Sequence, residues 1–220
     1  MSGAGRGVVL LDVDGCLVDS TRPVGEAIDA ALVDHGVAPL APGELQALIG
    51  PPLKIGLAGH LDRVGADLGI VDSLIATYRQ RYAPLSIELA ASYPGVPEAV
   101  AALAAEGRRL AVVTSKPQVF AVPILEALGL DRHLEVMVGP GPEEIEPKTT
   151  TMARALALLD PFDPSGSVMV GDRHHDVEAA HAHGLRAIGV LWGFGTEDEL
   201  RSAGAHAVVA DATELLAALA

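Results

Sequence analysis

The chain has 220 residues, half of them hydrophobic, so it is long enough to bury one large core or a core with a smaller second unit. Its 15 basic and 29 acidic residues give a net charge of −14, which argues against nucleic acid as a partner, because clustered Lys and Arg bind phosphate backbones. The single cysteine, Cys16, excludes an intramolecular disulfide. Neither a run of about 18 uncharged apolar residues nor a signal-peptide pattern occurs. We therefore expect a cytoplasmic protein with no membrane partner.

Short apolar runs predict the strands of a sheet. In chain order they cover Val8–Asp12, Leu110–Thr114, Glu135–Val138, Val168–Gly171, Ala187–Val190 and, as a short last strand, Ala207–Val209. Helical stretches lie between most of them, at Val96–Glu106, Gln118–Leu128 and Thr150–Leu158. This alternation is typical of βαβ units and predicts an α/β fold with a doubly wound, Rossmann-like parallel sheet.

One long insertion interrupts the alternation. The stretch from Asp14 to Leu110 is far longer than the roughly 30 residues of an ordinary crossover unit. Apolar residues recur in it at helical spacing, and breaks at Ala41-Pro42-Gly43 and Gly50-Pro51-Pro52 divide it into several helices. We expect an all-helical cap domain at residues 21–87, inserted into an α/β core of residues 1–20 and 88–220. Helices that merely pack on the sheet are the alternative.

Two acidic clusters each follow a predicted strand, Asp12-Val13-Asp14-Gly15-Cys16 and Gly171-Asp172-Arg173-His174-His175-Asp176. Ligands bind at the carboxyl ends of parallel strands, and carboxylates converging there need a cation such as Mg²⁺. Asp12 and Asp14 are two apart in an extended segment, so they face the same way. One can attack phosphorus while the other moves a proton. A helix-capping aspartate beside a solvated one is the alternative.

Other polar residues follow the predicted strands. Thr114 and Ser115 can hold phosphate oxygens, or one of them can cap the next helix. The chain has only three lysines, and two of them, Lys116 and Lys148, come after strands. Lys148 could neutralise a transferring phosphoryl group, or it could be a surface lysine. The third, Lys54, is a candidate for gripping a second anionic group of a substrate, or it is solvated.

The second cluster divides into acidic and histidine residues. Asp172 suits a metal ligand, and Asp176, one helical turn further, suits a supporting or water-mediated partner. The four histidines of this region are spaced unfavourably for one metal site, so we expect ordinary surface residues; they are His174, His175, His181 and His183.

Two glycine-rich segments carry no nucleotide-binding pattern. Gly3-Ala4-Gly5-Arg6-Gly7 precedes a strand instead of following one. Gly193-Phe194-Gly195-Thr196 follows a strand, but we expect Thr196 and Glu199 to form a capping box, which makes this segment a loop beside the site. We also expect Cys16 to be a small buried residue and not a nucleophile.

Taken in order, these residues closely resemble the haloacid dehalogenase-like phosphatase superfamily. DVDGCLVDS is similar to its first motif, VVTSKP to its Ser/Thr motif, Lys148 to its lysine, and GDRHHD to its acidic motif. The long insertion lies where that superfamily places a type 1 cap. The stretches at 93–96, 49–53 and 189–195 resemble its phosphoglycolate phosphatase-like branch. Cys16 departs from the usual threonine of the first motif, which could weaken a local hydrogen bond.

The resemblance implies a Mg²⁺-dependent phosphomonoester hydrolase with an aspartyl-phosphate intermediate. Asp12 would be the nucleophile and Asp14 the general acid and then base, while Thr114 and Lys148 would stabilise the phosphoryl group. The side chains of Asp12 and Asp172 and the backbone carbonyl of Asp14 would hold Mg²⁺, with Asp176 in support. Ser115 and Lys54 complete the candidate substrate-binding residues.

Several alternatives remain open. A phosphomutase on the same scaffold would need a bisphosphate activator, and a receiver-like module would keep its aspartyl phosphate for minutes without turnover. A dehalogenase is disfavoured, because Asp14 supplies a proton shuttle that suits a phosphatase. The expected partner is a small phosphorylated metabolite, such as 2-phosphoglycolate, a nucleoside 5′-monophosphate or a sugar phosphate. Monomer and homodimer are both compatible with the sequence.

Overall fold

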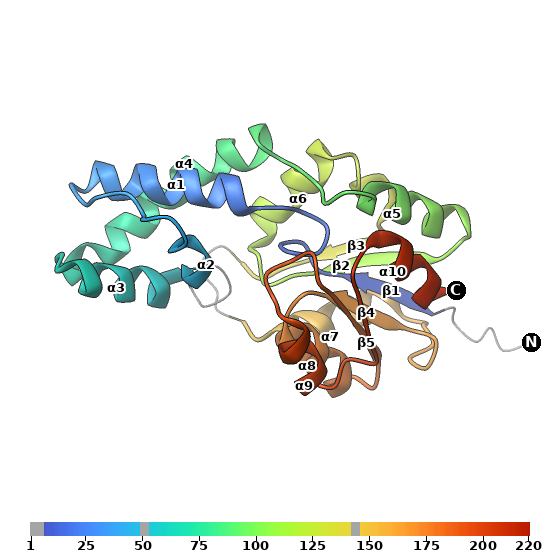
Figure 1. Cartoon of the computed structure of the whole chain (residues 1–220). Helices are drawn as coiled ribbons and strands as arrows, with labels where there is room; N and C mark the ends of the chain where they lie inside the picture. The colour runs from blue at the N-terminus through green and yellow to red at the C-terminus, as the bar shows by residue number, and fades with distance from the viewer. Residues whose placement is uncertain (1–6, 49–52, 142–145) are drawn as a thin grey trace, which may run out of the picture. The chain divides into compact units, whose positions relative to one another are not determined.

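The computed structural model describes residues 7–48, 53–141 and 146–220 (Figure 1). Most of the glycine-rich start of the chain and the break at Gly50-Pro51-Pro52 therefore lie outside the described residues. So does most of the stretch at 49–53 that resembles the phosphoglycolate phosphatase-like branch. The chain divides into two compact units, Met1–Asp19 with Ala91–Ala220 and Ser20–Ala90.

The first unit is built on a six-stranded sheet in the order β3-β2-β1-β4-β5-β6, with every pair of neighbours parallel. The strands are β1 (Val8–Leu11), β2 (Arg109–Val113), β3 (Val136–Val138), β4 (Val168–Gly171), β5 (Arg186–Val190) and β6 (Ala207–Val209). Every residue of β1 and β4 is buried, as expected for central parallel strands that are covered on both faces. The predicted α/β fold class is confirmed.

Helices cover both faces of this sheet. They are α5 (Val96–Ala105), α6 (Gln118–Ala127), α7 (Lys148–Leu159), α8 (His174–Ala182), α9 (Glu197–Ser202) and α10 (Ala212–Leu219), with a short 3₁₀ helix η2 (Asp131–His133). Figure 1 shows α5, α6 and α10 on one face and α7, α8 and α9 on the other. Apolar side chains of α7 and α8, such as Met152 and Val177, form one buried cluster with Leu10 of β1 and Met169 of β4. The sheet is thus held between two helical layers.

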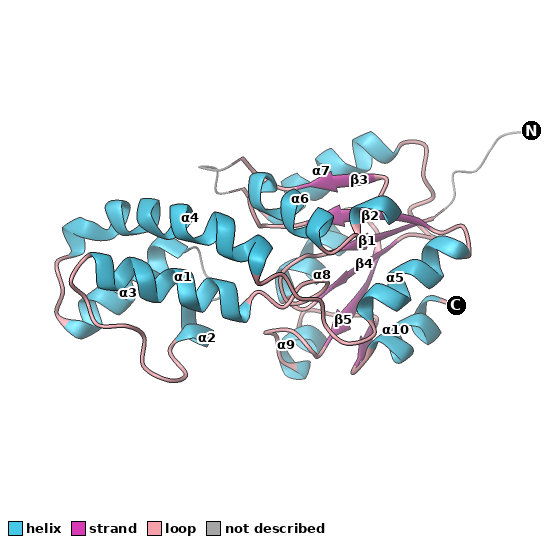
Figure 2. Cartoon of the chain, turned by 90° about the horizontal axis from the view of Figure 1, so that it is seen from above, coloured by secondary structure: helices cyan, strands magenta, loops and turns pink. Residues whose placement is uncertain are grey.

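The second unit is entirely helical within its described residues (Figure 2). It contains α1 (Thr21–Asp34), α2 (Leu45–Leu48), α3 (Leu53–Val64), the 3₁₀ helix η1 (Leu68–Ile70) and α4 (Val71–Glu88). Its core contains pairs four residues apart, Ile28 with Leu32 in α1 and Leu57 with Leu61 in α3, which lie on one face of each helix. Leu74 of α4 packs into the same cluster. In the described part of the chain, no helix is both long and apolar enough to span a bilayer.

Small differences in the element ends place the polar residues. Strands β1 and β2 end at Leu11 and Val113, one residue earlier than predicted, so Asp12 and Thr114 come directly after them. Helix α7 begins at Lys148 and not at Thr150, directly after Pro147, whose φ of −58° and ψ of 139° are those of a non-helical N-cap residue. Three candidate residues therefore stand at element ends, where side chains are available for function.

Candidate active site

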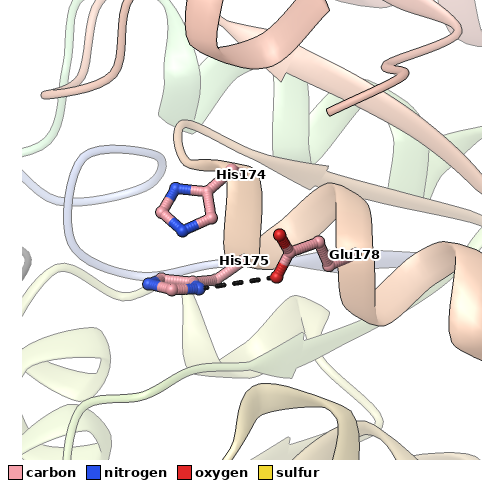
Figure 3. A group of neighbouring side chains, drawn as sticks. All are labelled: His174, His175 and Glu178. Carbon is pink, nitrogen blue, oxygen red and sulfur yellow. Dashed lines mark ion pairs between the residues drawn. The ribbon is translucent and has the colours of Figure 1, made fainter. Parts of the chain in front are cut away.

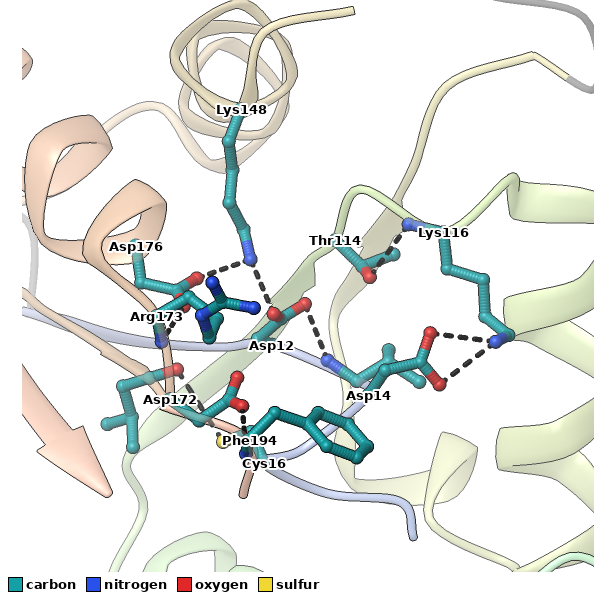
Figure 4. Close-up of polar contacts among 12 residues, drawn as sticks. Asp12, Asp14, Cys16, Thr114, Lys116, Lys148, Asp172, Arg173, Asp176 and Phe194 are labelled. Atoms are coloured by element: carbon teal, nitrogen blue, oxygen red, sulfur yellow. Dashed lines mark hydrogen bonds and ion pairs between the residues drawn. The ribbon is translucent and has the colours of Figure 1, made fainter. Parts of the chain in front are cut away.

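The carboxyl ends of three neighbouring strands bring the candidate residues together (Figure 4). Asp12 follows β1, Thr114 follows β2 and Asp172 follows β4, and these strands lie side by side in the sheet. Lys148 from the start of α7 and Asp176 from the first turn of α8 point into the same group. Parallel strands thus gather side chains from both ends of the sequence at one edge.

Asp12 lies at the centre of this group and is only 8% exposed. Its backbone N–H donates to the Val170 carbonyl at 3.0 Å, which extends the pairing of β1 with β4. Its Oδ1 accepts from the Val13 N–H at 2.7 Å, and its Oδ2 lies 2.6 Å from the Lys148 Nζ. Burial raises the pKa of Asp12 to about 6, although Lys148 acts in the opposite direction. The carboxylate is therefore both oriented and more basic than usual.

Lys148 joins two of the carboxylates. Its Nζ contacts Asp12 and makes an even closer ion pair with Asp176, and its side chain is 4% exposed. Burial alone would lower the pKa of Lys148, but the charges of Asp12 and Asp176 outweigh it and raise the pKa above its usual value. A surface lysine is thus the wrong description, and Lys148 is a fixed buried cation.

The buried Asp172 carboxylate has only one of its two oxygens hydrogen-bonded within the described residues. Its Oδ2 accepts from the Phe194 N–H at 2.7 Å, while its Oδ1 is buried and has no hydrogen-bond partner among the described residues. Burial raises the pKa of Asp172 to about 7, with Asp12 and Asp176 adding to the effect. A buried carboxylate oxygen without a partner is costly and indicates a group that the protein atoms alone do not supply.

A divalent cation fits this arrangement. One carboxylate oxygen from each of Asp12, Asp172 and Asp176 lies within 4.8 Å of the others, and all three residues are buried. Lys148 supplies one positive charge against these three carboxylates. Hard oxygen donors with an unused ligand atom are the donors that Mg²⁺ prefers. The residues present therefore fit Mg²⁺.

Asp14 is held by a lysine to which the sequence assigned no role. The Lys116 Nζ donates to both carboxylate oxygens of Asp14, at 2.9 Å to Oδ1 and 2.7 Å to Oδ2. Two features of the sequence pointed to Lys116: lysine is rare in this chain, and Lys116 comes after a predicted strand. The Thr114 Oγ1 accepts from the Lys116 N–H at 3.1 Å, so both residues belong to one turn after β2. Lys116 is thus an addition to the candidate site.

The turn after Asp14 requires a glycine. Gly15 has a φ of +80°, and its N–H donates to the Val18 carbonyl at 3.1 Å. A Cβ at this position would lie 2.2 Å from the Asp172 Oδ2. The first acidic motif can therefore approach the second only because residue 15 has no side chain.

Neither Thr114 nor Ser115 caps the helix that follows. Pro117 is the N-cap residue of α6, and its side chain makes no capping hydrogen bond. Thr114 is buried at the strand end, whereas Ser115 is exposed. The N-cap alternative is therefore wrong for both residues.

The expected capping box at Thr196 and Glu199 forms only in part. The Thr196 Oγ1 accepts from the Glu199 N–H at 3.2 Å. The Glu199 carboxylate, however, accepts from the Arg173 Nε at 2.8 Å and from the His174 N–H at 3.0 Å. Burial acts to raise the pKa of Glu199, but the effect of these hydrogen bonds is larger and lowers the pKa to about 2. The side chain that should close the box instead ties α9 to the second acidic motif.

Cys16 is buried beside the carboxylates. Its thiol donates to the Val170 carbonyl at 3.6 Å, and the Trp192 Nε1 donates to its backbone carbonyl at 2.9 Å. Burial, and then the charge of Asp12, raise the pKa of the Cys16 thiol well above its usual value. A thiol in this state is inert, which agrees with the expected packing role.

Lys54 belongs to the helical unit. Its Nζ donates to the Asp72 Oδ1 at 2.6 Å, and both side chains are exposed. Exposed pairs of this kind contribute little to stability. The expected role of Lys54 in substrate binding stays a prediction.

Comparison with known proteins agrees with this geometry. The family model described as haloacid dehalogenase-like hydrolase matches residues 9–190. The chain therefore belongs to the haloacid dehalogenase-like hydrolase family, and the resemblance that the motifs predicted is confirmed.

Individual relatives carry more than one description. The tyrosine-protein kinase PtkA of Mycobacterium tuberculosis is 36% identical over 193 residues, which cover 87% of this chain but only 64% of that protein. A phosphoglycolate phosphatase of Cupriavidus necator is 35% identical over 214 residues, covering 96% of this chain and 91% of its own. The solved structure of a Clostridium acetobutylicum protein, described as a predicted phosphatase, matches with a TM-score of 0.83 at 29% identity and 98% coverage of both chains.

Proposed function

We propose that this protein is a Mg²⁺-dependent phosphatase, which hydrolyses small phosphomonoesters through a phosphoryl group carried by Asp12. The main observation behind this proposal is that Asp12, Asp172 and Asp176 lie together beside Lys148. Among the described residues, the buried Asp172 Oδ1 in this group has no hydrogen-bond partner. Phosphoryl transfer depends mainly on positioning and on neutralised charge, which such a group supplies. The relation to a named phosphoglycolate phosphatase supports hydrolysis.

The chemistry divides into two displacements. In the first, a carboxylate oxygen of Asp12 forms a bond to phosphorus, the bond from phosphorus to the ester oxygen breaks, and Asp14 protonates the leaving oxygen. In the second, a water molecule attacks the same phosphorus and gives its proton to Asp14, while the bond to Asp12 breaks and releases phosphate. Thr114 and Lys148 bind the phosphoryl oxygens throughout.

The side chains of Asp12 and Asp172 and the backbone carbonyl of Asp14 would hold Mg²⁺. When bound, Mg²⁺ would neutralise the charge on the transferring phosphoryl group. Asp176 supports the cluster and keeps Lys148 in place through its ion pair. The Phe194 N–H fixes the orientation of the Asp172 carboxylate.

We infer that residues of the helical unit and of the loop after β2 determine the substrate specificity. Lys54 and Ser115 are the candidate residues for the part of the substrate beyond the phosphate. The substrate class is a small phosphorylated metabolite, acted on in the cytoplasm by a monomer or homodimer without nucleic acid or membrane.

The test is phosphate release from 2-phosphoglycolate, nucleoside 5′-monophosphates and sugar phosphates, each with Mg²⁺ and with EDTA. We expect turnover of a few related compounds that requires Mg²⁺, and none by Asp12→Asn, which should keep the circular dichroism spectrum of the wild type. An Asp12→Asn protein with near wild-type turnover would end the proposal. So would a folded wild-type protein that releases no phosphate from any compound.

A second candidate is phosphoryl transfer to an acceptor other than water, and the relation to PtkA, named a tyrosine-protein kinase, favours it. A phosphomutase would turn over a sugar phosphate only with a bisphosphate activator. A receiver-like module would hold its aspartyl phosphate for minutes. Acid-quenched protein labelled from a ³²P donor, followed over time with water, a sugar phosphate or a tyrosine peptide as acceptor, separates these alternatives.

A further inference from the structure

Helix α8 begins with two consecutive histidines whose surroundings differ from those of the other two histidines in this region. The His181 ring packs edge-on against the His206 ring, with centroids 5.5 Å apart. The His183 Nε2 lies 2.9 Å from a backbone carbonyl of α7. His174 and His175 instead lie together, with ring centroids 3.7 Å apart. The four histidines thus form no single metal-binding group, but His174 and His175 lie close to a third potential ligand.

That third residue is Glu178, one turn further along α8 (Figure 3). One potential ligand atom from each of His174, His175 and Glu178 lies within 4.8 Å of the others. The His175 Nδ1 and the Glu178 Oε2 are 3.8 Å apart, which is too far for a hydrogen bond. Two ligands bound to one tetrahedral Zn²⁺ at about 2.0–2.2 Å each lie about 3.4 Å apart. The two exposed side chains therefore need to approach by only a few tenths of an ångström to share one ion.

The helix itself provides a chelating spacing. His174 and Glu178 are four residues apart and therefore lie on one face of α8, one turn above each other. The same spacing places the two zinc-binding histidines of an H-E-x-x-H helix. His175 adds a ligand from the adjacent position.

His174 is also oriented as a metal ligand. Its Nδ1 lies 2.6 Å from the Glu199 Oε1. A carboxylate only accepts hydrogen bonds, so in the neutral ring Nδ1 donates and the lone pair is on Nε2. In Figure 3 this second nitrogen faces the His175 ring. A histidine that binds a metal almost always donates its other N–H to such a partner, and Arg173 holds Glu199 in place.

We propose that His174, His175 and Glu178 form a second cation site, which binds a divalent transition metal such as Zn²⁺ and is distinct from the carboxylate cluster. Imidazole ligands suit Zn²⁺, Co²⁺ and Ni²⁺, whereas Mg²⁺ prefers oxygen ligands, so the two sites select different ions. The three side chains are 34%, 53% and 61% exposed, which lets an ion and its remaining water ligands enter directly from solvent. This proposal does not depend on the phosphatase activity.

The test is a Co²⁺ titration of the full chain without a histidine tag, in excess Mg²⁺ so that the carboxylate cluster is occupied. Visible absorption of bound Co²⁺ reports imidazole ligation, and added Zn²⁺ should displace it. We expect one equivalent to bind with micromolar affinity. His174→Ala, His175→Ala and Glu178→Gln should each weaken binding by at least about tenfold. His181→Ala removes another exposed histidine of α8 and should bind as the wild type does.

A further variant tests the orientation of His174. Glu199→Gln keeps the size of the side chain but removes its charge, and it should weaken Co²⁺ binding by about 10–100-fold while all three ligands remain. Circular dichroism checks that each variant is folded; Glu178 is exposed, so Glu178→Gln is the variant least prone to misfold. The proposal is overturned if the wild type binds no stoichiometric Co²⁺ above the Mg²⁺ background. It is equally overturned if the ligand variants bind as the wild type does, or if His181→Ala loses binding as they do.

Discussion

The Lys116 ammonium group donates to both carboxylate oxygens of Asp14, at 2.9 and 2.7 Å. Its side chain is only 6% exposed, while that of Asp14 is 29% exposed. The turn after β2 therefore supplies a buried cation that fixes the carboxylate following β1. In the proposed reaction Asp14 moves the proton, so Lys116 determines where that carboxylate stands.

Loss of Lys116 should therefore lower the rate through Asp14. In Lys116→Gln we expect kcat for a phosphomonoester to fall by at least about tenfold, and by no more than the roughly 10²–10⁴-fold that the whole general acid contributes. The measurement is steady-state phosphate release. The matched control is Arg201→Gln, which removes an exposed cation paired with Glu197 and should leave kcat unchanged. An unchanged kcat in Lys116→Gln would contradict the positioning role.

Asp14→Asn should separate the two displacements. We expect turnover of a sugar phosphate to fall by about 10²–10⁴-fold, because neither leaving oxygen nor water has its proton partner. With para-nitrophenyl phosphate, whose leaving group needs no protonation, the first displacement should persist and give a burst of nitrophenol followed by a slow steady state. Rapid-mixing absorbance measures the burst. A wild-type rate with the sugar phosphate would show that Asp14 moves no proton.

The stability of the metal-free protein should depend on pH through Asp172. Its pKa is raised from 3.8 to about 7, so the folded state binds this proton more tightly than the unfolded chain does. The free energy of unfolding then falls as the pH rises between these two values, because the unfolded chain loses the proton first. Bound Mg²⁺ should offset the loss, because it binds only the folded state.

Urea unfolding at pH 5 and pH 8, with EDTA and with Mg²⁺, measures this effect. Asp172→Asn should remove part of the pH dependence in EDTA and most of the stabilisation by Mg²⁺. Equal Mg²⁺ stabilisation of Asp172→Asn and the wild type would contradict the assignment of Asp172 as a ligand.

Gly193 should tolerate no side chain. A Cβ there would lie 2.3 Å from the Gly15 carbonyl oxygen and 2.5 Å from the Asp172 Oδ2. Gly193→Ala should therefore displace Asp172 and weaken both Mg²⁺ affinity and thermal stability. The control is Gly59→Ala in α3, where nothing lies within 4 Å and alanine is favoured over glycine by up to about 1 kcal/mol. A change in melting temperature that is equal in both variants would contradict the argument.

The fold was predictable because its signals are local. Val8–Leu11 and Val168–Gly171 are short apolar runs that are each followed by an aspartate, and each forms a central strand. Spacing along the chain also placed Asp12 and Asp172 at strand ends. The predicted helix start at Thr150 is two residues late, since the helix begins directly after Pro147, and sequence patterns fix helix ends only to within a few residues.

The directions of long side chains were not predictable in the same way. Lys116 and Asp14 meet from the turns after two neighbouring strands, β2 and β1, and the sequence holds no periodicity for a contact between residues so far apart. The spacing of Thr196 and Glu199 matched a capping box, but the Glu199 carboxylate accepts hydrogen bonds from Arg173 and His174 instead. His174 and Glu178 meet through the helix turn, a pairing that the spacing of the histidines alone does not reveal.

Strand β1 pairs with two strands that are made much later, since Val9 lies opposite both Leu110 and Val168. At about 5–20 residues per second, the ribosome needs roughly 10–30 s to deliver Val168 after Val9. The helical unit, by contrast, has its whole core within residues 20–90 and is complete earlier in synthesis. The order of translation therefore delivers the helical unit first, and it completes the cluster of Asp12, Asp172 and Asp176 only after four of the six strands have been made.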